Sequence, residues 1–434
     1  MSVTGTITYI PKYGEINQSK ILGVINSSPI SGYVNRSIIS GRTNLAQIYG
    51  IVSISDVYIE PILYCDEALA LFARMSVQPS ALLADLIDKT IIDLKVAGVW
   101  DKLDCYYRFD LHTQQASLLN WKGDLYNATA VNGIAWNTTL GFTGAATKYL
   151  NSNFNPSTNG VNYTLNSASQ GITMIDQQIG TWAGLIGALS SASAKAVLYA
   201  RATDNMLFNY INSSLYMAGG IPRIGMMGQQ RLNIMMQTMV NGNSAANASR
   251  ASAEVPSINV FMLCTNNSGT PTYISIATAC DAFIGGNLGY GAGSAHLALY
   301  NINKYFRDNI DSVLLGPELN PDPYFNDDSL WTSTTSNWTI SNNTATFAGG
   351  TADNLILKAP PINANVVGEQ YRIVITHTAA LANVYIEFSS GTGGVTGSGT
   401  FTKIVNCGSA TEYFGIRTGT PGDVTYFSIK KVIG

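Results

Sequence analysis

Charged side chains are scarce in this chain of 434 residues. Asp, Glu, Lys and Arg make up 12% of it, against roughly 25% in an average soluble domain, so Asn, Ser, Thr, Gln and Gly must make its surface polar. The 24 basic and 27 acidic residues leave a net charge of −3. No cluster of Lys or Arg could neutralise a row of phosphates. We therefore expect no nucleic acid among its partners.

Long apolar runs and cysteine motifs are missing as well. No run approaches the roughly 18 apolar residues of a membrane span, and residues 1–18 lack the basic start and apolar core of a signal peptide. We therefore expect no membrane insertion.

The five cysteines, which have no Cys-x-x-Cys spacing, are expected to be buried free thiols; they are Cys65, Cys105, Cys264, Cys280 and Cys407.

Histidine is rare too, and no pattern of nucleophile and base stands out. His112, His296 and His377 are the three histidines. The sequence Asp110-Leu-His112 could place two metal ligands on one side of a strand, but a lone Asp-x-His more often forms a polar structural pair. The histidines therefore predict no metal site.

Carboxylates that could act together are neighbours in sequence. Asp101 with Asp104, or Asp327 with Asp328, would have to supply a pair for glycan cleavage, yet Asp residues this close usually cap turns. We therefore predict no catalytic residues and expect that the protein is not an enzyme.

A structural calcium ion is the one alternative to a chain without cofactors. Its ligands would come from acidic residues after position 320, namely Asp322, Asp327, Asp328 and Asp353. No loop there has calcium-loop spacing.

Short strand-like runs, residues 195–200 and 206–211 among them, dominate the pattern along the chain. Residues 141–167 combine aromatics and Thr with Gly, Asn, Ser and Pro, and Lys148 is their only ionisable side chain apart from tyrosines; this is typical of antiparallel sheet with polar turns.

Apolar spacing predicts helix within 66–98, with Pro79 in a first turn and Gly98 as a stop, and again at 295–311. Residues 316–323 hold three prolines and predict an extended spacer.

These patterns predict a mainly β fold of two β-sandwich (jelly-roll) domains with a few helices. The predicted organisation is an N-terminal strand-rich attachment segment at 1–62, a sandwich with flanking helices at 63–318, and a second sandwich at 319–434. The first segment has too little apolar mass for a core of its own, so it either packs on a neighbouring subunit or particle, or adds strands to the next domain.

Several segments from residue 67 to 309 carry a resemblance to a known module. They are 67–76 (EALALFARMS), 86–98, 100–107 (WDKLDCYY), 117–121 (SLLNW), 141–167 and 282–305. In order and spacing they resemble a laminin G or concanavalin A-like sandwich found in bacteriophage tail and appendage proteins. The C-terminal unit, through 338–347, 371–376 and 426–432, resembles a carbohydrate-binding-module type of jelly roll.

The resemblance implies contact with sugars through exposed aromatic rings. The candidates are Trp182 and Tyr290 in the middle domain and Trp331 and Trp338 in the last one. Each could instead be a core aromatic, since large rings dominate sandwich cores.

The resulting expectation is a bacteriophage virion protein, a tail or head fibre or a similar appendage. It would assemble in the host cytoplasm, attach to other virion proteins through its N-terminal segment, form a homo-oligomer, by analogy a trimer, and contact host-surface glycans from the outer surface of the particle. The alternatives are a purely structural decoration or tail protein that binds no sugar, and a glycan depolymerase.

Overall fold

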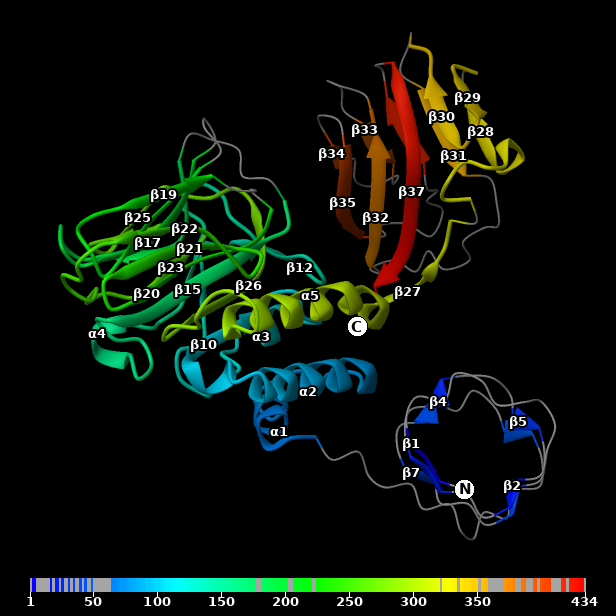
Figure 1. The fold of residues 1–434 in the computed structure, drawn as a ribbon. Coiled ribbons are helices and arrows are strands. Elements are labelled where there is room, and N and C mark those ends of the chain that lie inside the picture. Colours follow the sequence, from blue (N-terminus) through cyan, green and yellow to red (C-terminus); the bar gives the residue numbers. More distant parts are fainter. Residues whose placement is uncertain are drawn as a thin grey trace. The chain divides into compact units, whose positions relative to one another are not determined.

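A computed structural model gives the fold (Figure 1). It describes residues 64–176, 182–201, 206–220, 224–320, 322–333, 336–349, 353–357, 370–378, 384–387, 393–395, 399–406, 415–418 and 421–432, together with nine short strands before residue 50. Antiparallel sheets dominate, and helices are few. The prediction of a mainly β chain built from sandwiches is confirmed. The chain divides into two units, Met1–Cys65 and Asp66–Gly434.

The first unit pairs its strands in parallel at a fixed distance along the chain. Its strands are β1 (Ser2–Thr4), β2 (Ile16–Asn17), β3 (Lys20–Leu22), β4 (Ile25–Asn26), β5 (Ile30–Ser31), β6 (Val34–Asn35), β7 (Ile39–Ser40), β8 (Thr43–Asn44) and β9 (Ile48–Tyr49). Ser2 pairs with Lys20, Ile16 with Val34, Ile25 with Thr43, Ile30 with Ile48 and Ile21 with Ile39. Every pairing joins residues eighteen apart, as in the stacked coils of a β-solenoid.

The sequence carries a signal for this parallel pairing that the apolar pattern alone does not show. Glycine recurs every ninth residue, at Gly5, Gly14, Gly23, Gly32, Gly41 and Gly50, so two nine-residue repeats match one eighteen-residue coil. Each coil therefore pairs with the next, which is how a segment with little apolar mass can form sheet.

The second unit begins with a two-sheet sandwich. One sheet, called here the helix sheet, has the order β12 (Ala135–Asn137), β13 (Gly141–Thr143), β26 (Thr278–Gly285), β15 (Ser167–Met174), β20 (Gly225–Leu232), β21 (Met235–Val240) and β22 (Asn243–Ser249), with β10 (Leu103–Arg108) also on β26. The other, called the groove sheet, has the order β11 (Thr129–Val131), β14 (Tyr149–Asn151), β23 (Phe261–Met262), β16 (Ala183–Leu189), β17 (Lys195–Arg201), β18 (Met206–Ile211) and β19 (Met217–Gly220), with β24 (Thr265–Asn267) on β16 and β25 (Thr270–Thr272) on β24.

Alternation along the strands puts the core between these sheets. In β17, Ala196, Leu198 and Ala200 point inward, and Leu207 and Ile211 do so in β18. Asn209, which is fully buried between Leu207 and Ile211, also points inward. The described side chains that alternate with this inward set point to the outer face of the groove sheet, because successive side chains of a strand alternate in direction.

Helices accompany the sandwich. They are α1 (Asp66–Phe72), α2 (Ala81–Val96), η2 (Trp100–Lys102), α3 (Gln114–Ser117), α4 (Pro156–Asn159) and α5 (Ala295–Leu314). Ser80 caps α2 by accepting a hydrogen bond from the Leu83 amide, and Gly98 follows its end with φ +64°. Both predicted helical regions are confirmed, although Pro79 precedes the cap instead of lying in the first turn.

A buried ion cluster helps to hold α5 on the helix sheet. Arg108 contacts Asp110 at 2.6 Å and Asp281 at 3.2 Å, with all three side chains essentially inaccessible. Its guanidinium lies 4.1 Å from the centroid of the Phe306 ring on α5. Two carboxylates, one shortly after β10 and one on β26, thus compensate the cation, and the helix covers it.

The C-terminal sandwich has one sheet of β29 (Trp338–Ser341), β30 (Thr344–Phe347), β37 (Gly422–Val432), β32 (Gln370–His377) and β35 (Gly399–Asn406), with β27 (Leu315–Glu318) on β37. Its second sheet has β28 (Trp331–Ser333), β31 (Asp353–Leu357), β36 (Gly415–Thr418), β33 (Val384–Glu387) and β34 (Gly393–Val395), and η3 (Asp328–Leu330) precedes β28.

Strand β27 follows α5 without a break and pairs with β37. Part of the segment predicted as a proline-rich spacer is therefore a strand of the C-terminal sheet. The predicted boundaries at residues 62 and 318 stay predictions. No helix in the described ranges is both long and apolar enough to cross a membrane.

Candidate functional site

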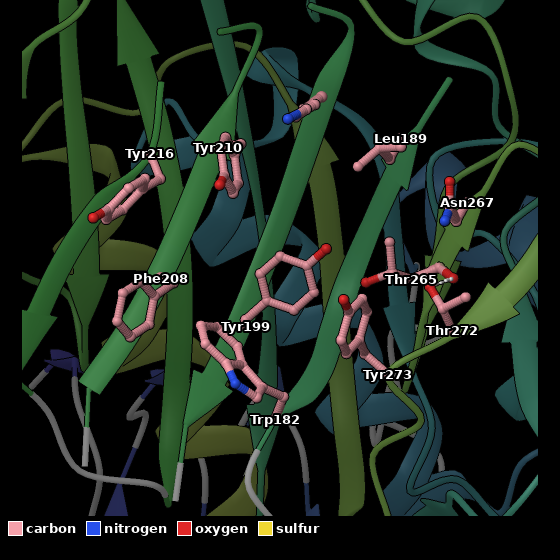
Figure 2. A pocket seen from close by; sticks show the side chains of 11 residues that line it. Trp182, Leu189, Tyr199, Phe208, Tyr210, Tyr216, Thr265, Asn267, Thr272 and Tyr273 are labelled. Atoms are coloured by element: carbon pink, nitrogen blue, oxygen red, sulfur yellow. Dashed lines mark hydrogen bonds between the residues drawn. The ribbon is translucent and has the colours of Figure 1, made fainter. Parts of the chain in front are cut away.

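A groove of about 650 Å³ lies on the outer face of the groove sheet. Figure 2 shows its labelled side chains above the strands. The lining residues are Trp182, Leu189, Lys195, Tyr199, Phe208, Tyr210, Tyr216, Thr265, Asn267, Thr272 and Tyr273. Aromatic side chains therefore make up about half of the lining.

Strand pairing fixes the floor of the groove. Tyr199 of β17 lies opposite Phe208 of β18, and Lys195 lies opposite Leu189 of β16. Tyr210, two residues after Phe208, points to the same face. Directly opposed side chains in a sheet lie close enough to touch, so the backbone register holds these groups together without further loops.

Six of the lining side chains form a continuous row of rings, called here the aromatic row. In order, the centroid distances are 6.0 Å from Tyr210 to Tyr216, 5.8 Å to Phe208, 5.0 Å to Trp182, 5.9 Å to Tyr199 and 5.2 Å to Tyr273. These distances lie in the range of favourable aromatic pairs. The row thus joins strands β17 and β18 to three flanking loop positions.

The row is open to solvent at three rings. Trp182 is 39%, Tyr216 53% and Tyr273 51% exposed, whereas Tyr199 is buried beneath them. Burial raises the pKa of Tyr199 to about 12. Its hydroxyl is therefore neutral at physiological pH, and it can donate as well as accept a hydrogen bond.

Polar groups accompany the rings. Thr265, Asn267 and Thr272 come from the β24–β25 hairpin, and the Thr272 hydroxyl donates to the Thr265 carbonyl at 3.4 Å. Lys195 holds its ammonium 4.8 Å from the centroid of the Tyr210 ring. The groove thus offers apolar ring faces, hydroxyl and amide groups, and one cation.

The four aromatic residues predicted from sequence occupy different environments. Trp182 belongs to the groove, and Tyr290, 60% exposed, lies in the loop before α5 and is not among the groove-lining residues. Trp331 and Trp338 are only 3% and 8% exposed and pack in the C-terminal core. A ligand in solvent cannot reach these two indoles, because they fill the interior of the sandwich.

The polar residues considered above as metal ligands or catalytic carboxylates make structural contacts wherever their side chains are described. Asp110 pairs with Arg108, and His112 contacts the Val77 carbonyl at 2.9 Å, so the two do not share a site. Asp104 accepts hydrogen bonds from the amides of Asn162 and Tyr163. It acts as an anchor for a turn.

The acidic residues proposed for calcium have backbone partners. Asp322 accepts from the amides of Asn326 and Asp327, and Asp327 caps η3 through Ser329. The side chain of Asp353 lies outside the described residues. Among the residues described, no three His, Cys, Asp or Glu side chains gather in a metal-binding cluster.

Most of the aromatic row was missed from sequence. Its signal was the alternation in 195–201 and 206–211, where Lys195, Val197 and Tyr199, and then Phe208 and Tyr210, share a face. Both runs were predicted as strands. What sequence could not supply is that Tyr216 and Tyr273, from other segments, would extend the row.

Comparison with known proteins gives structural likenesses only. No family model matches the chain, and no curated protein matches it. A sialidase of Trypanosoma rangeli, solved with sialic acid, is 9% identical with a TM-score of 0.35; the match covers 51% of this chain and 39% of that one. The chain thus spans about two fifths of the length of that sialidase.

Two smaller domains are also similar. Domain 4 of AbnA, a GH43 extracellular arabinanase from Geobacillus stearothermophilus in complex with arabinotriose, is 12% identical with a TM-score of 0.33, over 46% of this chain and 98% of that one. The CBM40 of a Ruminococcus gnavus sialidase bound to α2,3-sialyllactose is 13% identical with a TM-score of 0.23, over 28% and 76%.

These likenesses correct one prediction from the sequence. The chain was expected not to be an enzyme, but similar structures include a sialidase and a domain of an arabinanase. The expectation counted only histidines and carboxylates that are neighbours in sequence, whereas glycoside-cleaving carboxylates come together through folding. The expectation that the chain is not an enzyme is therefore withdrawn.

Proposed function

We propose that the groove binds a carbohydrate. The observation that carries this proposal is the aromatic row, which leaves the rings of Trp182, Tyr216 and Tyr273 partly exposed beside hydroxyl and amide groups. Exposed rings that touch one another along a groove are not needed to fill the core, which lies on the opposite face of the same strands. Such apolar patches mark binding sites.

Sugar chemistry fits this combination. A pyranose presents a face of C–H groups, which packs on an aromatic ring, and a rim of hydroxyls, which need hydrogen-bond partners. Asn267, Thr272 and the Tyr273 hydroxyl can supply those partners around the rings. A purely apolar ligand would leave these polar groups unpaired.

We further propose that the chain acts as a bacteriophage appendage that contacts host-surface glycans, with the first unit as its attachment to the particle. The segment-by-segment resemblance described above and the weakly charged surface support this role. A homo-oligomer, with three copies as the preferred number, would present several grooves together. Linked weak sites can raise avidity by roughly 10² to 10⁴ where the geometry permits simultaneous contact.

A glycan array probed with the full-length chain tests the binding proposal. We expect selective binding that falls about tenfold in Tyr216→Ala, because a stacking platform is lost. Tyr290→Ala removes a tyrosine of similar exposure outside the groove and should bind as the unaltered protein does. Failure to bind any glycan at high valency would favour the structural decoration protein instead.

Immunogold electron microscopy tests the particle role. Antibody against this chain should label purified phage particles at an appendage. Particles that contain the chain in an interior or that lack it altogether would contradict an outer-surface role.

A further inference from the structure

Lys195 carries the only formal charge among the described residues that line the groove. We infer that the bound glycan bears an anionic substituent, a carboxylate, phosphate or sulfate, and that Lys195 binds it. This inference rests on the proposed carbohydrate site. It goes beyond it by naming the class of sugar and the residue that distinguishes it.

The position of Lys195 is set by the sheet. It is the first residue of β17, it pairs with Leu189, and its carbonyl accepts a hydrogen bond from the Asn212 amide at 2.7 Å. In Figure 2, Leu189 and Tyr210 lie at the top of the groove and Trp182 at the bottom. Because Lys195 pairs with Leu189 and contacts the Tyr210 ring, its ammonium belongs to the end away from Trp182.

This ammonium has an aromatic neighbour but no carboxylate within the described part of the chain. Asp and Glu are absent from the described lining of the groove. Glu254, which lies close to the turn before β17, accepts hydrogen bonds from Ser193 at 2.9 Å and Ser191 at 3.4 Å. The described structure therefore leaves the charge of Lys195 uncompensated.

An anionic sugar would complete the site. The Tyr210 ring restricts the flexible lysine and replaces part of its water shell, so less ordering remains when an anion binds. A charge-assisted hydrogen bond from the ammonium would add to ring stacking along the aromatic row. A neutral sugar would stack equally well but would leave the cation without an ion partner.

The test uses matched glycans on the same array. Polysialic acid, polygalacturonate and dextran sulfate are printed beside carboxyl-reduced polysialic acid, methyl-esterified polygalacturonate and unmodified dextran, with phosphorylated oligosaccharides and their dephosphorylated forms. At low salt we expect the best-binding acidic glycan to exceed its neutral counterpart by about threefold to tenfold. Which pair shows the difference identifies carboxylate, sulfate or phosphate as the source.

Two variants assign that preference to Lys195. Lys195→Gln should abolish the difference between charged and neutral forms, and Lys195→Arg should retain it. Raising the salt concentration should reduce it, because screening weakens an exposed ion contact.

Different results would contradict the inference about the anionic sugar and the proposal of a carbohydrate site. Equal binding of charged and neutral forms, binding of neutral glycans alone, or a preference that survives in Lys195→Gln overturns this inference and leaves the carbohydrate site intact. Absence of binding to every glycan overturns both.

Discussion

The two sandwiches of this chain use their large aromatic residues in opposite ways. The first leaves a row of rings on the outer face of a sheet, whereas the second places Trp331 and Trp338 in its core. Both strands that carry indoles in the second sandwich are short and lie close to turns. The difference shows that an aromatic residue in a strand indicates a site only when its neighbours on the same face are also aromatic and the core is filled from the other face.

The largest expected effect is the loss of stability that follows removal of a core ring, which removal of a groove ring should not cause. Trp331→Ala should lower the free energy of unfolding of the C-terminal sandwich by about 3–5 kcal/mol. The indole is buried, packs 4.9 Å from Phe325 between ring centroids, and donates to Asp322 at 3.0 Å. Urea unfolding followed by circular dichroism measures the change.

Tyr324→Ala is the matched control for Trp331→Ala, since its ring is 55% exposed in the same sandwich. We expect it to cost less than about 1 kcal/mol. Equal losses in the two variants would mean that burial of Trp331 does not stabilise the C-terminal core, and the contrast with the groove would disappear.

A pH effect of intermediate size belongs to the first sandwich. His296 of α5 is completely buried against Phe283, which lowers its pKa to about 4. In the unfolded chain the His296 side chain takes up a proton near pH 6.5. The contribution of neutral His296 to the free energy of unfolding is therefore fully present above pH 6.5. It is lost as the pH falls towards 4, by about 3 kcal/mol in total.

Comparison of unfolding at pH 7 and pH 4.5 in the unaltered protein and in His296→Leu isolates this effect from the titration of carboxylates. The variant should lose less stability over this interval. Identical losses in both proteins would show that His296 is not held neutral by burial.

The smallest expected stability effect completes the comparison. Trp182→Ala should change the free energy of unfolding by about 1 kcal/mol or less, because its ring is partly exposed and the core lies on the other face. Glycan affinity, in contrast, should fall about tenfold. A large loss of stability with unchanged affinity would make Trp182 a structural residue, as Trp331 is.

Sequence predicted the elements better than the site. The strands around Tyr199 and Phe208 and the helix after Ser294 followed from local spacing, because alternation and capping act within a few residues. The site did not follow, because Tyr273 approaches Tyr199 from a segment more than 70 residues away. No local pattern specifies which strands become neighbours.

The first unit shows the opposite case. Its parallel pairing could have been predicted, since Gly at every ninth position from Gly5 to Gly50 is visible in the sequence and matches the eighteen-residue register. The sequence around Trp331 and Trp338 does not show that these two residues are buried and therefore unsuitable as ligand candidates. Their burial depends on closure of two sheets by strands more than 80 residues further along the chain.

The most direct test of the carbohydrate site is a crystal structure of the protein with the strongest-binding oligosaccharide from the array. We predict sugar rings stacked on Trp182, Tyr216 or Tyr273, with hydrogen bonds to groups of the β24–β25 hairpin. A sugar bound to the C-terminal sandwich, with the aromatic row vacant, would contradict the account.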